Sequence, residues 1–322
     1  MLAAYAAGVD ADDPLSCLQV GEVIPGQTPD EWVNVRVRAG SLNHHDLWAL
    51  KGQALPADRV PMILGTDAAG VTDDGREVIV HAVIGQPGVH GDETLDPKRS
   101  LLSEVYPGTL AEVVRVPAQN LVPKPASLTW EQAACLPTAY LTAFRMIAHR
   151  SSTDAGDTIL VQGAAGGVAT AAIVVGKAMN RRVWVTSRSP AKREWALGQG
   201  ADAAFEPGQR LPERVDAVIE TVGAATWDHS LKSLRPGGCI VVSGATSGAN
   251  PPADLNRVFF LQLSIVGSTM GTRNELLELI ELLHSSGARP VIDRVLPLAD
   301  AAEGFAAMAE GQLHGKVVLT VA

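Results

Sequence analysis

The stretch Thr158-Ile-Leu-Val-Gln-Gly-Ala-Ala-Gly-Gly-Val-Ala169 decides the fold. It begins as an apolar run typical of a buried strand, continues as a glycine-rich turn, and predicts a helix from about Gly167. This unit binds the pyrophosphate of a dinucleotide, because free N–H groups and the helix dipole hold negative charge there. Ala164 and Ala169 depart from the strict G-x-G-x-x-G form, so a purely structural strand-turn-helix is the alternative. The backbone predicted to approach the phosphates is that of Gly163, Ala164, Ala165, Gly166, Gly167 and Val168.

A second apolar run, residues 182–189, follows at the length of one βαβ unit. An acidic residue at its end would hold the ribose 2′-hydroxyl of NAD. The sequence instead has Ser187 and Arg188, with Lys192 one helical turn further on. A guanidinium group suits the 2′-phosphate of NADP, so the predicted cofactor is NADP(H). The alternative is a solvated basic start of a helix.

Two further strands complete a doubly wound parallel sheet, at residues 216–220 and 239–244. Both end in small residues at the carboxyl edge of the sheet, where a ligand of this fold binds. The residues predicted to line the cofactor there are Thr221, Gly223, Gly244, Ala245 and Thr246.

Composition excludes several classes of protein. The chain has 322 residues, enough for two domains, and a net charge of −9 that disfavours nucleic acid and anionic membranes as partners. Three scattered cysteines, Cys17, Cys135 and Cys239, predict neither a disulfide framework nor a zinc finger. The first residues lack the basic start of a signal peptide, and no run approaches the ~20 apolar residues of a membrane span. These features predict a cytoplasmic protein.

The first 122 residues read as a β-rich domain. Val33, Val35 and Val37 alternate with polar residues, and residues 73–75 predict a hairpin turn between strands 68–72 and 77–81. Strands are also expected at 15–20 and 109–116, and a short helix within 42–52. A helical pattern over 127–147 should break or kink at Pro137.

The end of the chain returns to this β-rich domain. After helices expected at 255–262, 274–285 and 299–310, residues 316–321 read as a closing strand without a local partner. We therefore expect this strand to pair with the N-terminal domain. Another apolar strand is expected at 263–269.

This order of parts resembles the medium-chain dehydrogenase/reductase superfamily, especially its quinone oxidoreductase-like members and bacterial relatives of the zinc-binding alcohol dehydrogenase type. The matching motifs are Leu42-Asn-His-His-Asp-Leu47, Ile63-Leu-Gly-Thr-Asp-Ala-Ala-Gly70, residues 136–144, residues 259–270 and His314-Gly-Lys-Val-Val-Leu319. The resemblance implies an α/β protein with a GroES-like β-rich catalytic domain, residues 1–122 and 271–322, and a Rossmann NADP-binding domain, residues 123–270. It adds Thr142, Gly267, Ser268 and Thr269 to the cofactor site.

The sequence departs from the zinc-dependent members of this superfamily. Their ligands are a cysteine and a histidine–glutamate pair at the positions of Asn43 and Thr66-Asp67, with another cysteine or carboxylate near Thr138. Residues 82–104, where four cysteines would hold a structural zinc, contain none. Because zinc prefers thiolate and imidazole ligands, we predict no metal site. Metal binding by His44 and His45 is a weaker alternative, and we expect Asp46 to orient its helix.

The resemblance places Asn43, Thr66 and Thr138 around the position that a zinc ion would occupy in relatives. Their amide and hydroxyl groups are candidate donors to a substrate oxygen, and the alternative is that they only fill space. Tyr140 is either a proton donor to an enolate or a packing residue. The predicted activity is hydride transfer from NADPH to a quinone, enone or aldehyde without zinc. The alternatives are a zinc alcohol dehydrogenase with atypical ligands and a non-catalytic NADPH-binding protein. The 263–267 strand, at the sheet edge in this family, predicts a homodimer.

Overall fold

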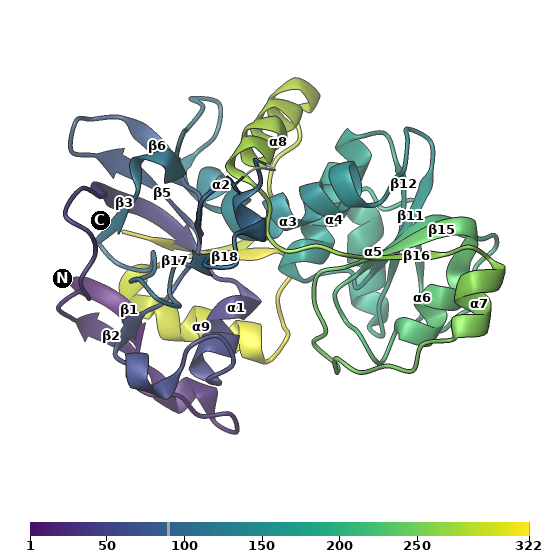
Figure 1. Ribbon diagram of the computed structural model, residues 1–322, viewed down its shortest axis with the longest axis horizontal. Helices are drawn as coiled ribbons and strands as arrows, with labels where there is room; N and C mark the ends of the chain where they lie inside the picture. Colours follow the sequence, from purple (N-terminus) through teal and green to yellow (C-terminus); the bar gives the residue numbers. More distant parts are fainter. Residues whose placement is uncertain (89–90, 322) are drawn as a thin grey trace. The chain divides into compact units, whose positions relative to one another are not determined.

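The computed structural model describes residues 1–88 and 91–321 and contains two compact units (Figure 1). The first unit comprises Met1–Ala139, Thr272–Ile280 and Pro290–Ala322, and the second comprises Tyr140–Gly271 and Glu281–Arg289. Compared with the predicted domains, residues 123–139 therefore lie with the first unit and residues 281–289 with the second. The first difference arises because helix α2 (Trp130–Ala134) contacts strands β3 and β5 of the first unit.

The first unit is built from three β-sheets. An antiparallel sheet has the order β2-β1-β4, a larger sheet has the order β10-β6-β5-β3-β18-β17 with β9 also paired to β3, and β7 pairs with β8. The strands are β1 (Leu2–Ala6), β2 (Leu18–Glu22), β3 (Val33–Ser41), β4 (Met62–Ile63), β5 (Ala68–Thr72), β6 (Glu77–Val80), β7 (Val83–Ile84), β8 (Ser100–Leu101), β9 (Val113–Val116), β10 (Leu121–Pro123), β17 (Ile292–Pro297) and β18 (Lys316–Thr320).

The closing strand β18 joins the first unit as predicted, because it pairs antiparallel with β3, with Val318 opposite Ser41. The expectation that it lacks a local partner was wrong, since β17 runs parallel beside it. The sequence of β17, Ile-Asp-Arg-Val-Leu-Pro, carries two adjacent charges and has no continuous apolar run. The predicted strand at 15–20 begins only at Leu18, after a 3-10 turn, and the predicted strand at 109–116 only at Val113.

The core of the first unit lies around two helices, α1 (His44–Leu50) and α9 (Ala301–Ala309). Leu47 and Leu50 of α1 and Phe305 of α9 belong to one apolar cluster with Leu64 and Leu319, all of them buried. The cluster fixes the start of α1 and the start of β18 against the same core. Both elements carry residues of the site described below.

The second unit is the predicted parallel sheet, with strand order β13-β12-β11-β14-β15-β16, covered by helices (Figure 1). Every neighbouring pair is parallel. Its strands are β11 (Thr158–Gln162), β12 (Arg182–Thr186), β13 (Ala203–Phe205), β14 (Val215–Glu220), β15 (Leu234–Val242) and β16 (Ser264–Gly267), and β16 lies at the sheet edge as expected. Its helices are α3 (Leu141–Phe144), α4 (Gly167–Ala178), α5 (Pro190–Gly198), α6 (Trp227–Ser233) and α7 (Leu255–Phe260), and α8 (Arg273–Ser286) contributes residues to both units. The predicted α/β fold class is confirmed.

The helical pattern predicted over 127–147 is interrupted at Pro137. Helix α2 ends at Ala134, a π-helical turn covers Leu136–Tyr140, and a second follows α3 at Arg145–Arg150. Proline lacks the N–H that an α-helix needs in its interior, so the wider turn accommodates it. This turn presents Thr138. No helix in the described part of the chain is long and apolar enough to cross a membrane.

Candidate functional site

The glycine turn between β11 and α4 has the conformation that an approaching anion requires. Gly163 has φ +118°, which side-chain-bearing residues rarely adopt, and Gly166 is the N-cap of α4. A Cβ atom built on Gly166 would meet no atom within 4 Å, whereas Ala164 and Ala165 are buried. Open space therefore lies beside free backbone N–H groups at the start of a helix, as the binding of a phosphate demands.

The cationic side chain of Arg188 follows the end of β12. Arg188 is exposed, and none of the residues that the structure describes accepts a hydrogen bond from its guanidinium group. By contrast, Arg193 donates to Ser187 O at 2.6 Å and lies 3.1 Å from a carboxylate oxygen of Glu206. Lys192 takes part in an interaction of its own. Arg188, with the hydroxyl of Ser187 beside it in the chain, is thus the group suited to a 2′-phosphate.

The loops after β14, β15 and β16 hold the other predicted cofactor residues. Gly223 has φ +88°, and a Cβ atom there would lie 2.5 Å from Gly248 O, so two loops approach closely at a position only glycine fits. The buried Glu220 carboxylate accepts the N–H of Gly223 at 3.0 Å and fixes this loop. After β16, the buried hydroxyl oxygen of Ser268 has no hydrogen-bond partner among the described residues. The predicted residues on these three loops and on α3, namely Thr142, Thr221, Gly223, Gly244, Ala245, Thr246, Gly267, Ser268 and Thr269, all belong to the second unit.

In the first unit the three predicted catalytic residues form one hydrogen-bonded set. Asn43 precedes α1, Thr66 lies between β4 and β5, and Thr138 lies on the π-helical turn. Asn43 Nδ2 donates to Thr66 Oγ1 at 3.1 Å, and Thr66 Oγ1 lies 2.9 Å from Thr138 Oγ1. Asn43 and Thr66 are buried, and Thr138 is partly exposed. Thr138 is therefore the member of the set that is not fully buried.

Two charged residues complete this set, and the sequence analysis gave them no part in catalysis. Lys316 Nζ, at the start of β18, donates to Asn43 Oδ1 at 2.5 Å and to Leu42 O at 2.6 Å, and lies 3.2 Å from Asp67 Oδ2. Asp67 Oδ2 also accepts from Asn43 Nδ2 at 2.8 Å and from Ser41 Oγ at 2.6 Å. Lys316 is 2% exposed and Asp67 0%. Lys316 lies in the His314–Leu319 motif and Asp67 in the Ile63–Gly70 motif, but neither was assigned a catalytic role.

The neighbouring Asp46 orients α1, as predicted. Its carboxylate accepts the backbone N–H of Asn43 at 2.8 Å and of Gly65 at 3.1 Å. Burial raises the pKa of Asp46 to about 6, although the nearby His45 and the N–H of Asn43 oppose this shift. Asp46 therefore holds the start of α1 and the β4–β5 loop together, and so holds Asn43 near Thr66.

The histidines beside this aspartate have other partners. His45 Nε2 lies 3.1 Å from Glu104 Oε1, and the His44 ring packs edge-on against Trp48. Burial lowers the pKa of His44, with a smaller contribution from Lys51. Within residues 1–88 and 91–321, no group of three or more His, Cys, Asp or Glu side chains is arranged to hold a metal ion. Tyr140 is fully buried.

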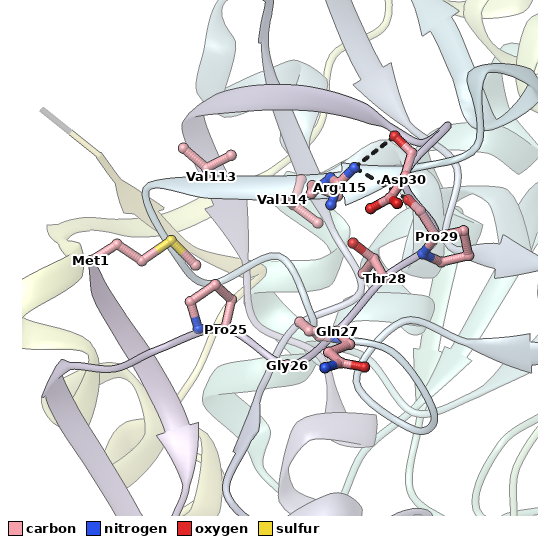
Figure 2. Close-up of a pocket in the computed structure, with 11 residues that line it drawn as sticks. Met1, Pro25, Gly26, Gln27, Thr28, Pro29, Asp30, Val113, Val114 and Arg115 are labelled. Atoms are coloured by element: carbon pink, nitrogen blue, oxygen red, sulfur yellow. Dashed lines mark hydrogen bonds between the residues drawn. The ribbon is translucent and has the colours of Figure 1, made fainter.

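Two cavities in the first unit are lined by residues other than the predicted catalytic ones. One of about 640 Å³ lies beside residues 25–30, where the Arg115 guanidinium donates to Pro29 O at 3.2 Å and to Asp30 O at 3.0 Å (Figure 2). A smaller one of about 160 Å³ is lined by His81, Glu93 and Arg273, among others.

Family models match both units of the chain. The alcohol dehydrogenase GroES-like domain matches residues 29–126, and the zinc-binding dehydrogenase domain matches residues 167–285. Together these matches cover more than half of the chain. They agree with the two-part division described above.

Individual relatives match almost the whole chain. Acryloyl-coenzyme A reductase from Metallosphaera sedula is 28% identical, over 94% of this chain and 96% of its own. The solved structure of an NAD-dependent alcohol dehydrogenase is 32% identical, with a TM-score of 0.91, and covers 100% of both chains. The structure of the 2-octenoyl-CoA carboxylase reductase CinF with NADP and 2-octenoyl-CoA is 27% identical, with a TM-score of 0.87, over 98% of this chain and 87% of that one. The chain is an oxidoreductase that belongs to the medium-chain dehydrogenase/reductase superfamily.

Proposed function

We propose that this protein uses NADPH to reduce a quinone, an enone or an aldehyde, without zinc. The observation that carries the proposal is the hydrogen-bonded set of Asn43, Thr66 and Thr138, whose last member is a partly exposed residue. Amide and hydroxyl groups are hydrogen-bond donors rather than ligands that zinc prefers.

The second unit is the proposed cofactor-binding unit. The open space at Gly166 suits the pyrophosphate, and the unengaged guanidinium of Arg188 suits the 2′-phosphate of NADP. The related CinF structure contains NADP, whereas another related structure is named an NAD-dependent enzyme, so the choice rests on Arg188. When bound, NADPH supplies the hydride that is added to the electrophilic carbon of the substrate.

The donor set near Asn43 does not fit a catalytic zinc ion. Asn43 Oδ1 already accepts from the Lys316 ammonium, and Asp67 Oδ2 lies 3.2 Å from the same group. A second cation brought to these oxygens would be repelled at short range, and no thiolate or imidazole stands at the matching positions. The proposal therefore assigns the stabilisation of the substrate oxygen to the protein's own donors.

Addition of hydride to a carbonyl or conjugated carbon moves an electron pair onto the substrate oxygen. We assign the Thr138 hydroxyl to hydrogen-bond this oxygen, and the proton that completes the reduction comes from solvent. A donor aligned with developing charge contributes up to about 3–4 kcal/mol in the transition state. Relatives named for acryloyl-CoA and 2-octenoyl-CoA act on conjugated thioesters, which favours the enone class here.

Turnover and metal content test this function together. Purified protein is titrated with NADPH and NADH by nicotinamide fluorescence, then assayed with quinones, enones including a 2-enoyl thioester, and aldehydes. We expect NADPH oxidation with at least one acceptor, unaffected by a chelator. Stoichiometric zinc whose removal abolishes activity would support the zinc alcohol dehydrogenase instead. Tight NADPH binding without turnover on any acceptor would support the non-catalytic alternative.

A further inference from the structure

The orientation of the Asn43 amide is fixed by charged groups on both sides. Its Oδ1 faces the Lys316 ammonium, which only donates, and its Nδ2 faces the Asp67 carboxylate, which only accepts. If the amide were rotated by half a turn, its N–H groups would face the Lys316 ammonium and its oxygen would face the Asp67 carboxylate. Lys316 has three acceptors for the three N–H bonds of an ammonium group, Leu42 O, Asn43 Oδ1 and Asp67 Oδ2.

This amide determines the role of Thr66. Asn43 Nδ2 lies 2.8 Å from Asp67 Oδ2, 3.1 Å from Thr66 Oγ1 and 3.4 Å from Ser41 O. We assign its two N–H groups to the two shorter contacts, so the Thr66 oxygen accepts. Thr66 is fully buried, and among the described residues its remaining side-chain neighbour within hydrogen-bond distance is Thr138 Oγ1, at 2.9 Å. A buried hydroxyl proton without an acceptor costs about 1–3 kcal/mol, so Thr66 donates to Thr138.

The direction of the whole chain of hydrogen bonds follows from these two steps. We propose that Lys316 is a positioning residue whose ammonium orients Asn43, Thr66 and Thr138 in turn, so that the Thr138 hydroxyl points its own proton away from Thr66 and toward the substrate oxygen. The inference rests on the proposed function for the identity of that acceptor. The sequence-based expectation was that the Asn43 amide is a candidate donor to the substrate oxygen. In this proposal the amide N–H groups instead donate to Asp67 and Thr66.

Charge strengthens this arrangement as well as orienting it. An ammonium group on Asn43 Oδ1 polarises the amide and makes its N–H groups better donors, and each later hydrogen bond is polarised in the same sense. Asp67 balances the charge of Lys316, so the buried set carries no net charge from this pair. With the chain reversed, Thr138 would donate to Thr66 and present only lone pairs, which repel a developing oxyanion.

A double-mutant cycle on turnover tests the coupling. Thr138→Val should lower kcat about 10²-fold with the NADPH dissociation constant unchanged, and Thr138→Ser should restore most of it. Lys316→Met should lower kcat about 3- to 100-fold in the wild-type background and by less than about twofold in the Thr138→Val background, because its effect passes through that hydroxyl. Equal losses in both backgrounds would overturn the proposal.

Lys316→Met leaves the buried Asp67 carboxylate unpaired, so the variant can fail to fold. Thr66→Val then takes its place, because it removes the middle link without unpairing a charge. In the same cycle with Thr138→Val, the losses of kcat should again be non-additive. Additive losses of kcat would contradict the proposed series of hydrogen bonds.

Neutron diffraction of the deuterium-exchanged protein provides a readout that does not depend on turnover. A deuteron on Thr66 Oγ1 directed at Thr138 supports the inference, and a deuteron on Thr138 directed at Thr66 refutes it. If the wild-type protein shows no turnover, the proposed function fails while this measurement still decides the direction of the hydrogen bonds.

Discussion

We expect cofactor preference to depend on Arg188. Its guanidinium is exposed and donates no hydrogen bond to any residue in the described part of the chain, so it is available to pair with a 2′-phosphate. We expect Arg188→Ala to raise the dissociation constant of NADPH about ten- to a hundredfold, the equivalent of about 1.5–3 kcal/mol, and to leave that of NADH unchanged. Fluorescence titration measures both constants.

Arg210→Ala is the matched control for this experiment. It removes another exposed arginine of the second unit, so it changes the net charge by the same amount. Equal NADPH and NADH affinities in the unmodified protein, or equal effects of the two substitutions, would rule out the assignment of Arg188.

Glu93 gives the first unit a specific dependence on pH. Its buried carboxylate accepts the backbone N–H of Arg273 at 2.6 Å and lies 3.0 Å from His81 Nε2. Burial acts to raise the pKa of Glu93, but the adjacent His81 ring and the hydrogen bond from the Arg273 N–H outweigh it, and the pKa is lowered overall. Because the folded protein holds the carboxylate ionised more strongly than the unfolded chain does, this stabilisation is complete above about pH 4.3 and is lost as the pH falls further.

We therefore expect Glu93→Gln to lower the free energy of unfolding by about 1–3 kcal/mol at pH 7, with the difference shrinking below pH 4. Denaturant unfolding at a series of pH values measures it. Glu77→Gln is the control, because the Glu77 side chain is 52% exposed and its ion pair with Lys124 lies at the surface. A difference for Glu93→Gln that persists unchanged at acid pH would contradict the ionic role.

At the scale of elements, the turn between β11 and α4 contains one glycine that the backbone conformation requires and another that the proposed cofactor site requires. Gly163 has φ +118°, so Gly163→Ala should cost at least about 1–2 kcal/mol of stability. Gly166 has φ −74°, and its Cβ position is open, so Gly166→Ala should change stability by less than about 1 kcal/mol. The added methyl group nevertheless enters the space assigned to the pyrophosphate, and we expect NADPH affinity to fall at least tenfold.

Thermal unfolding and NADPH titration of both variants check this separation. Unaltered NADPH affinity in Gly166→Ala would mean that the cofactor does not lie against this turn. An unaltered melting temperature in Gly163→Ala would mean that the positive φ is not needed.

The elements most accessible to prediction were those whose sequence signals are local. Strand β11 and its glycine turn were identified because apolar runs and glycine act within a few residues. Strand β17 was missed because its pattern is mixed and its pairing with β18 spans a whole helix. Pairing partners distant in sequence leave no local pattern.

The residues of the candidate site likewise differ in whether local sequence motifs predicted them. Asn43, Thr66 and Thr138 were found through motifs that surround each of them, and the structure brings them within hydrogen-bond distance. Lys316 was missed as a site residue because it acts from the far end of the chain, through a strand that only the β3–β18 pairing brings beside Asn43. The amide orientation that decides donor and acceptor roles likewise depends on this tertiary contact.

At the scale of the whole molecule, the sheet of the second unit ends in an open edge. Strand β16 pairs with β15 on one side only, and Ile265 in it is 45% exposed. The adjacent helix α7 exposes Phe259 and Phe260 as well. Unpaired backbone groups beside exposed apolar side chains are unfavourable in a monomer and invite pairing with another strand.

We therefore expect a homodimer in which β16 pairs antiparallel with its copy across a two-fold axis, which extends the sheet and covers the exposed side chains. Light scattering at micromolar concentration should give twice the 33.7 kDa of the chain. Ile265→Lys should convert it to the monomer, because a buried charge at the new interface has no partner. Leu197→Lys, which adds the same charge at an exposed leucine of α5, should leave the dimer intact. A wild-type particle of 33.7 kDa would exclude this assembly, and a dimer that survives Ile265→Lys would place its interface elsewhere than β16.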